Sequence, residues 1–395
     1  MASTYSNTTQ EREATIVEPQ EVPEIAMDLF SVGLPLHLQG SPGIGKTYIG
    51  RVIAGQLAES QGLNLVICSQ NNQKIWNEDE FGFFESNMSH YESEDWMMPK
   101  IERKTGKYMR EPTDALPTTP NGLFQIDEIA KKPETYRFVA QLMNEGRIGW
   151  DYFLPKNTCI MTTSNLTSDR AGAHRLHSDL INRLGMYEVV PTAVGFANHH
   201  GEDLNPHVRG FLEWFPHQIL QFDPKKADQP FASPRSIFSV SRLMDTWCPE
   251  KKTGFDPEGA RAIKSLSGIV GFTWATSFLS ILAHKWSARE INDMIIDPEG
   301  CRTKIDKLKE DNDMIMVCSL TIMLTKRVVT DPTQYGPVMK FLLGINRECA
   351  VHFDTMLKRS LGDDSAAWQE IKASNSEYAK YRIETNDIRT NNYNN

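Results

Sequence analysis

The sequence lacks three features that would place it in a membrane, secreted or nucleic-acid-coating class. First, it has no apolar run long enough for a bilayer, because the stretch from Gly268 to Ala283 is short and contains threonine and serine, so we expect a buried helix there. Second, the N-terminal segment MASTYSNTTQEREAT has neither an apolar run nor a basic lead, so the sequence predicts no signal peptide and favours a cytoplasmic protein.

The third missing feature is an excess of basic residues. The formal net charge is −9, which argues against a surface built to coat nucleic acid or anionic lipid, although a local basic channel is compatible with that average. Six cysteines are scattered without the spacing of a zinc site or a disulfide framework, and we expect reduced thiols at Cys68, Cys159, Cys248, Cys301, Cys318 and Cys349. At 395 residues, 40% of them hydrophobic, the chain is long enough for two folded domains.

A phosphate-binding loop is the strongest positive signal. Residues 36–47 read LHLQGSPGIGKT, in which a short strand leads into Gly40, four residues, and Gly45-Lys46-Thr47. We expect Gly40, Gly43 and Gly45 to adopt a positive φ and turn backbone N–H groups inward. Lys46 can reach the β- and γ-phosphates of a nucleotide, and the Thr47 hydroxyl can bind Mg²⁺. A helical pattern follows, so the nucleotide would lie at a helix N-terminus, against Gly40, Ser41, Pro42, Gly43, Ile44, Gly45, Lys46, Thr47 and Tyr48.

An acidic pair follows another strand signal. Residues 121–130 read NGLFQIDEIA, so Asp127 and Glu128 come at the carboxyl end of a short strand, where ligands bind in open α/β sheets. We expect Asp127 to hold Mg²⁺ through water, and Glu128 to orient and activate the water that attacks the γ-phosphate. A helix cap is the alternative use of such a pair, and the phosphate-binding loop upstream favours catalysis.

Asn165 and Arg183 are candidates from the second half of this region. Asn165 follows a buried strand over 158–164 and can bond both the γ-phosphate and the attacking water, the alternative being a turn residue. Arg183 comes just before a strand at 186–190, where it can act as an arginine finger on a neighbouring subunit, with Arg170 and Arg175 as weaker candidates. Such a contact is heterologous, so it requires a ring or filament of like subunits.

Arg235 lies in the first turn of a helix that Ser233 would cap and Pro234 would begin. A cation there opposes the helix dipole, so a bound phosphate would explain it. The alternative is a solvated or salt-bridged arginine.

Other residues are weaker candidates for chemistry. The histidines at 199, 200 and 207 lack acidic or cysteine partners at zinc spacing. The tryptophans at 76, 96 and 150 lack interleaved arginines, which favours packing over base stacking.

Composition divides the chain into regions. We expect a disordered N-terminus (1–18), an α/β nucleotide domain (19–194), a linker (195–209), a helical domain (210–373) and a disordered tail (374–395). Within the α/β domain the pattern predicts a short helix (23–32), a buried strand (63–68), a long acidic and aromatic excursion between strands (70–122) and a hairpin (147–154).

These motifs together resemble those of the AAA+ ATPases, and within them the MoxR family of the helix-2-insert branch, over roughly residues 20–350. GSPGIGKT resembles the Walker A motif, LFQIDEIA the Walker B motif, TTSN sensor 1, INRL the arginine-finger segment and SPRS sensor 2. The family's insert would fall in residues 70–122. The stretch PTDALPTTPNG and residues 250–395 depart from the family's pattern.

The resemblance implies an α/β P-loop core with a parallel sheet flanked by helices, followed by an α-helical lid. It also implies ATP with Mg²⁺, a hexameric ring, chaperone-like remodelling of a protein, and a von Willebrand factor A domain partner. Two alternatives use the same loop: an AAA+ motor on nucleic acid, and a small-molecule kinase. ATP rather than GTP follows from the resemblance, and the sequence has no guanine-reading Asn-Lys-x-Asp motif.

Overall fold

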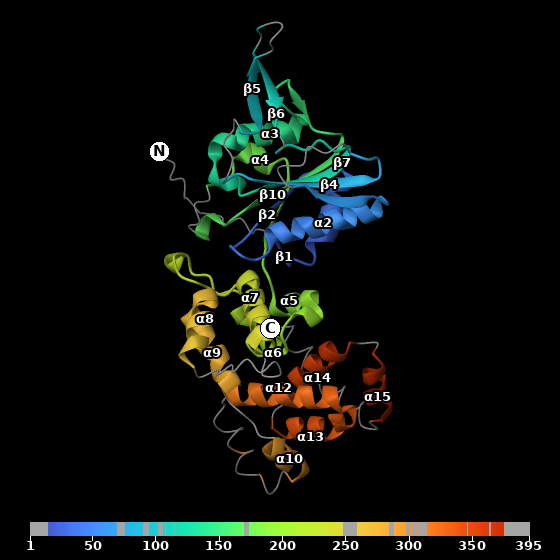
Figure 1. Cartoon of the computed structure of the whole chain (residues 1–395), viewed down its shortest axis with the longest axis vertical. Helices are drawn as coiled ribbons and strands as arrows, with labels where there is room; N and C mark the ends of the chain where they lie inside the picture. The colour runs from blue at the N-terminus through green and yellow to red at the C-terminus, as the bar shows by residue number, and fades with distance from the viewer. Residues whose placement is uncertain are drawn as a thin grey trace, which may run out of the picture. The chain divides into compact units, whose positions relative to one another are not determined.

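The chain divides into two compact units (Figure 1). The first contains residues 1–191 and 223–227, and the second contains residues 192–222 and 228–395. The computed structural model describes residues 15–68, 76–89, 95–101, 106, 108–113, 115–169, 174–247, 259–283, 288–297, 301, 306, 314–345, 347–362 and 365–374.

A seven-stranded parallel sheet forms the centre of the first unit, with strand order β1-β11-β2-β10-β7-β4-β3. Its strands are β1 (Ile16–Val17), β2 (Leu36–Gln39), β3 (Asn64–Cys68), β4 (Glu80–Asn87), β7 (Asn121–Asp127), β10 (Asn157–Ser164) and β11 (Gly185–Val189). Because every pairing is parallel, the carboxyl ends of β2, β10, β7 and β4 lie along one edge of the sheet. That edge is where the predicted site residues follow their strands.

Helices cover both faces of this sheet. Figure 1 shows α2 (Lys46–Ser60) on one face and α3 (Tyr136–Glu145) with α4 (Ser178–Ile181) on the other, and α1 (Val22–Ser31) precedes β2. α2 packs closely because Gly50 has no side chain: an added Cβ would lie 1.6 Å from Gln125 Oε1. On the other face, Val139 and Leu142 of α3 pack with Phe124 of β7. The expected α/β core, a parallel sheet flanked by helices, is therefore confirmed.

Two antiparallel hairpins accompany the sheet. β5 (Met97–Ile101) pairs with β6 (Tyr108–Pro112), and Figure 1 shows this hairpin extending away from the sheet. β8 (Arg147–Ile148) pairs with β9 (Tyr152–Phe153), which confirms the hairpin predicted over 147–154. α3 ends at Gly146 in the left-handed conformation, as its glycine predicts.

The structure corrects three predictions in this unit. The excursion over 70–122 contains β4, a central strand whose Phe81 and Phe83 are fully buried. β3 is an edge strand with Leu65 and Ile67 exposed, so it is not the buried strand expected over 63–68. β1 lies within the segment 1–18 that was expected to be disordered, because Ile16 and Val17 pair with β11; residues 1–14 lie outside the described residues.

Helices make up the second unit, as predicted for residues 210–373. Their bounds are α5 (Ala193–His200), α6 (Pro206–Trp214), α7 (Pro234–Trp247), α8 (Ala260–Val270), α9 (Phe272–Ala283), α10 (Ala288–Ile296), α12 (Met314–Thr330), α13 (Tyr335–Ile345), α14 (Arg347–Leu361) and α15 (Ala366–Ser374). One apolar core joins residues from all of them. The expected tail lies almost entirely beyond the described residues, which end at Ser374.

Two features of this unit bear on the sequence predictions. The expected linker over 195–209 is mostly helical, because Thr192 caps α5 and Asn205 caps α6 through their side-chain oxygens. The apolar stretch 268–283 contains α9, with a break at Gly271, whose φ is +87°. Among the described helices, none combines the length and the apolarity that a bilayer crossing requires.

Candidate nucleotide site

The phosphate-binding loop joins β2 to α2, as the sequence predicts. Gly43 and Gly45 adopt a positive φ, of 80° and 98°, which only glycine takes without strain. Gly40 does not, so its predicted positive φ is wrong and its reason is space: an added Cβ would lie 2.8 Å from the Val189 carbonyl oxygen of β11. Lys46 begins α2 directly after Gly45, so the loop faces a helix N-terminus, where backbone N–H groups favour anions.

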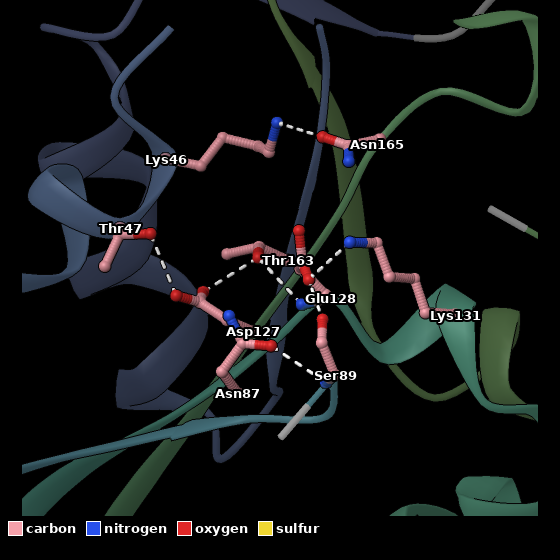
Figure 2. Close-up of polar contacts among 9 residues, drawn as sticks. All are labelled: Lys46, Thr47, Asn87, Ser89, Asp127, Glu128, Lys131, Thr163 and Asn165. Carbon is pink, nitrogen blue, oxygen red and sulfur yellow. Dashed lines mark hydrogen bonds and ion pairs between the residues drawn. The ribbon is translucent and has the colours of Figure 1, made fainter. Parts of the chain in front are cut away.

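Lys46 connects the loop to the end of β10. Its Nζ donates to the carbonyl oxygens of Gly40 and Ser41 at 2.6 and 3.0 Å, and to Asn165 Oδ1 at 3.1 Å (Figure 2). These contacts bring Lys46 and Asn165 together from positions far apart in the chain. The ammonium and the amide are therefore both beside the loop where phosphate oxygens would bind.

Asp127 ends β7 and is held by three donors. Thr47 Oγ1 donates to its Oδ2 at 2.8 Å, and Thr163 Oγ1 and Gln125 Nε2 donate to its Oδ1, each at 2.8 Å. The side chain is almost fully buried, with an exposed fraction of 4%. Figure 2 shows Thr47, Asp127 and Thr163 in one row of contacts. These three hydrogen bonds fix the direction of the carboxylate.

The Thr47 hydroxyl and the Asp127 carboxylate fit Mg²⁺. Both are hard oxygen donors, and Mg²⁺ in nucleotide enzymes binds through one or two such groups together with phosphates and water. Among the described residues no group of three or more histidine, cysteine and acidic side chains could hold a metal. The oxygens of Thr47 and Asp127 therefore suit a metal that arrives with a nucleotide.

Glu128 adopts a strained backbone at the end of β7. Its φ of +58° is positive, and no other non-glycine residue that the structure describes has this property. Its Oε2 accepts from Ser89 Oγ and from Lys131 Nζ, the latter at 2.8 Å (Figure 2). Burial would raise the pKa of this carboxyl, but the hydrogen bonds from Lys131 and Ser89 and the positive charges of Lys131 and Lys46 together outweigh it and lower the pKa. Glu128 is therefore ionised at neutral pH, as a base that polarises water must be.

Ser89 reaches the site because β4 lies beside β7. Asn87 pairs with Asp127 in the register, the Met88 amide donates to the Asp127 carbonyl oxygen at 2.9 Å, and the Ser89 amide donates to Asn87 Oδ1 at 2.8 Å. The sequence prediction missed Ser89, Lys131, Thr163 and Gln125 as members of the site. The polar residues that end EFGFFESN were the available signal, since TTSN ends β10 in the same way.

The arginines are placed less uniformly. Arg183 lies between α4 and β11, and β11 starts at Gly185, which pairs with Leu36 at the amino end of β2. Arg183 is thus at the opposite end of the sheet from its own phosphate-binding loop. Arg175 is exposed, and Arg170 lies outside the described residues.

Arg235 and Tyr48 complete the predicted set. Arg235 is exposed in the first turn of α7 in the second unit, so its approach to the nucleotide stays a prediction. The Ser236 amide donates to Ser233 Oγ at 3.4 Å, which agrees with the predicted cap. Tyr48 is 53% exposed on the first turn of α2, whereas Ile44 of the loop is buried.

The discounted aromatic residues have structural contacts. Trp96 is buried and donates from Nε1 to Ser86 Oγ at 3.3 Å. Trp150 is 79% exposed at the β8–β9 hairpin, with the Arg147 guanidinium 3.9 Å from its ring centroid. Neither arrangement forms a basic groove for stacked bases. The cysteines that the structure describes are free thiols.

Comparisons with known proteins give no closer assignment. No family model matches the sequence, and no curated protein matches it. Similar solved structures include a RuvB mutant of Thermotoga maritima (13% identity, 71% of this chain and 75% of that one, TM-score 0.32). Others are a predicted ATPase of Cytophaga hutchinsonii (10%, 94% and 89%, 0.29) and NtrX of Brucella abortus in complex with ATP (14%, 90% and 68%, 0.39). At these TM-scores the likenesses carry no argument, so any function assigned to the chain has to rest on the geometry of the site.

Proposed function

We propose that the chain is an AAA+ ATP hydrolase that depends on Mg²⁺. One observation carries this proposal: Lys46, Thr47, Asp127, Glu128 and Asn165 come from three separate segments and meet at one edge of the sheet through direct or shared hydrogen bonds. Phosphoryl transfer needs positioning and charge neutralisation more than covalent chemistry, and this set supplies both.

Each residue has a role that its contacts support. Lys46 and the N-terminus of α2 would bind the phosphates, while Asn165 would bond the γ-phosphate and help to orient water. Glu128, held ionised by Lys131 and Ser89, would accept a proton from that water. Thr47 and Asp127 would hold Mg²⁺, which when bound neutralises phosphate charge.

The metal role of Asp127 gives the first test. Phosphate release by the purified chain is measured against Mg²⁺ concentration for the wild type, Asp127→Asn, and the exposed control Asp151→Asn. We expect Asp127→Asn to need at least about tenfold more Mg²⁺, because one lost charged ligand contributes about 1.5–3 kcal/mol. An unchanged Mg²⁺ dependence in Asp127→Asn would remove the carboxylate from the metal site.

We further propose that the hydrolase works as a MoxR-like ring that remodels a partner protein. Arg183 supports assembly, since it lies at the far end of the sheet from its own loop and so suits the nucleotide of a neighbour. Exposed apolar side chains on the two hairpins suit contact with a protein substrate: Met98, Ile101, Tyr108, Trp150 and Phe153. A hexamer and a von Willebrand factor A domain partner follow the family resemblance.

Mixing variants tests this assembly. Arg183→Ala and Glu128→Gln should each be inactive alone, yet a mixture should regain part of the turnover if the arginine acts across subunits. Arg175→Ala, at the weaker finger candidate that the structure describes as exposed, should keep most of its activity; loss and rescue in Arg175→Ala instead would move the finger to Arg175. Absence of rescue, with mixed assemblies shown to form, would contradict the trans role.

DNA-stimulated turnover separates protein remodelling from work on nucleic acid. The net charge of −9 favours a protein substrate, so we expect turnover to change by less than about twofold when double- or single-stranded DNA is added. Strong stimulation that falls steeply with salt would instead assign the motor to nucleic acid. Stoichiometric phosphate transfer to a small acceptor would assign a kinase.

A further inference from the structure

His37 is a fully buried histidine in β2, three residues before the phosphate-binding loop begins. β2 lies between β11 and β10, and His37 pairs with Met186 on one side and Thr162 on the other. Its neighbours Leu36 and Leu38 are buried and apolar, so His37 is a polar residue in an otherwise apolar stretch of the strand. A buried polar ring therefore needs an explanation from its partners.

Both ring nitrogens of His37 contact hydroxyls of β10. Nδ1 lies 2.8 Å from Thr162 Oγ1, and Nε2 lies 3.1 Å from Ser164 Oγ. Thr162 Oγ1 also lies 3.4 Å from the Leu36 carbonyl oxygen, to which it donates. This network assigns the proton to Nδ1, which donates to Thr162, and leaves Nε2 to accept from Ser164. A single neutral ring thus spans two residues of the neighbouring strand.

The two hydroxyls flank the part of β10 that serves the site. Thr163 lies between them and donates to Asp127, and Asn165 follows Ser164 and accepts from Lys46. The Gly40 amide at the start of the loop donates to the Ser164 carbonyl oxygen at 3.3 Å. His37 therefore bonds the two residues on either side of Thr163, in the segment that connects the loop to Asp127 and Asn165.

The surroundings of His37 keep it uncharged. Burial and, to a smaller extent, the nearby positive charge of Lys46 together lower the pKa of the ring to about 3. The ring is neutral across the physiological range, so its hydrogen bonds do not change with pH there. A permanent bridge, rather than a proton donor or a pH switch, fits this environment.

We infer that His37 is a positioning residue, which fixes the carboxyl end of β10 against the phosphate-binding loop so that Asn165 and Thr163 are held at the nucleotide. The inference rests on the proposed function for its catalytic consequence. Its structural half, the fixing of β10, is independent of hydrolysis. The two halves can therefore be tested separately.

The structural half is tested on the nucleotide-free protein by amide hydrogen exchange. His37→Leu removes both hydrogen bonds at similar volume, and Leu38→Ile is the matched control on the opposite side of the same strand. We expect exchange at residues 162–165 and at Gly40 to become at least about tenfold faster in His37→Leu and to stay unchanged in the control. Unchanged exchange in His37→Leu would overturn the inference.

The catalytic half is tested by turnover and by nucleotide affinity. We expect His37→Leu to lower kcat by about 10- to 100-fold, as a displacement near 1 Å does, while its Kd for ADP stays within about twofold of the wild type. His37→Gln, which keeps a donor and an acceptor, should recover part of the loss and also serves if His37→Leu does not fold. A weakened ADP affinity with unchanged kcat would overturn the inference.

A double variant shows whether His37 acts through Asn165. If it does, adding His37→Leu to Asn165→Ala should lower kcat by a much smaller factor than His37→Leu does in the wild type. Full additivity would overturn the assignment. An inactive wild type with faster exchange in His37→Leu would contradict the proposed function and leave the positioning of β10 intact.

Discussion

Each unit of the chain contains charged side chains that are largely withdrawn from water, and the two groups are built differently. In the first unit, Lys46, Asp127 and Glu128 are held by partners from several strands and loops. In the second unit, Glu213 of α6 forms one ion pair with Arg359 of α14, with 2.6 Å between Oε1 and Nη1. The first group draws on hydroxyls, amides and carbonyls, whereas the second depends mainly on one pair.

The energetic consequences differ as well. Glu213 is 9% exposed, and its Oε2 has no hydrogen-bond partner among the described residues. Burial raises the pKa of Glu213 to about 7, although Arg359 and Arg209 oppose that rise. The pKa of Glu128 is lowered instead, because its hydrogen-bond donors and the positive charges of Lys131 and Lys46 together outweigh burial. A buried ion pair is thus weak evidence for function, whereas donors that converge on a strained backbone at a sheet edge point to a reaction site.

The largest expected effect comes from Lys46→Ala. The loss of two or more charged hydrogen bonds to phosphate, at about 1.5–3 kcal/mol each, should weaken ATP binding by at least about 100-fold and abolish turnover. Lys100→Ala, which breaks an exposed ion pair with Glu111, is the control and should bind normally. Calorimetry and circular dichroism of both variants measure affinity and folding. Tight ATP binding by a folded Lys46→Ala would remove the lysine from the site.

Glu128→Gln should separate binding from chemistry. Without a base to accept the proton from water, kcat should fall by about 10²–10⁴-fold while ATP affinity is retained. The control is Glu85→Gln, at an exposed pair with Arg51. Single-turnover kinetics with labelled ATP measures the chemical step directly. Near-normal turnover would show that Glu128 does not activate water.

Arg359→Met tests the second unit, where we expect an effect on stability and none on nucleotide affinity. Removing one partner leaves the Glu213 carboxylate buried and unpaired, so the acid takes up a proton, and the unit should lose about 1–1.5 kcal/mol at pH 8, one pH unit above the pKa of about 7. The loss should shrink as pH falls below the pKa of Glu213, since the neutral acid needs no partner. Denaturant unfolding across this range measures the effect, with nucleotide affinity as the control. Lost ATP affinity at unchanged stability would assign the pair to function and remove the contrast between the units.

Sequence alone predicted the parts of the site that are formed by short motifs of neighbouring residues. The loop, the acidic pair and Asn165 each follow a recognisable strand, and parallel strands bring their carboxyl ends together. β4 was missed because its buried phenylalanines do not alternate with polar residues, so the strand has no period of two. Ser89 was missed for the same reason. Its position near Glu128 depends on the register between β4 and β7, and no residue next to Glu128 in the sequence indicates it.

The helices within the expected linker were missed for a different reason. Residues 195–209 are rich in glycine, asparagine and histidine, which suggests a loop, but Thr192 and Asn205-Pro206 are helix-starting signals that outweigh composition. Gly40 shows the same limit within a correct motif. Its contact with Val189 comes from a strand almost 150 residues later, so only the folded sheet shows why a side chain does not fit.

The smallest expected effect concerns Lys131, whose half-exposed pair with Glu128 is worth about 1 kcal/mol or less. Because Lys131 lowers the pKa of Glu128, Lys131→Met should raise that pKa and shift the acidic limb of the pH–rate profile to higher pH. At pH 8 Glu128 stays ionised, so kcat should change by no more than about fivefold. Lys132→Met, one position along, is the matched control. An unshifted acidic limb in Lys131→Met would mean that the pair does not set the ionisation of the base, and the contrast with Glu213 would then rest on geometry alone.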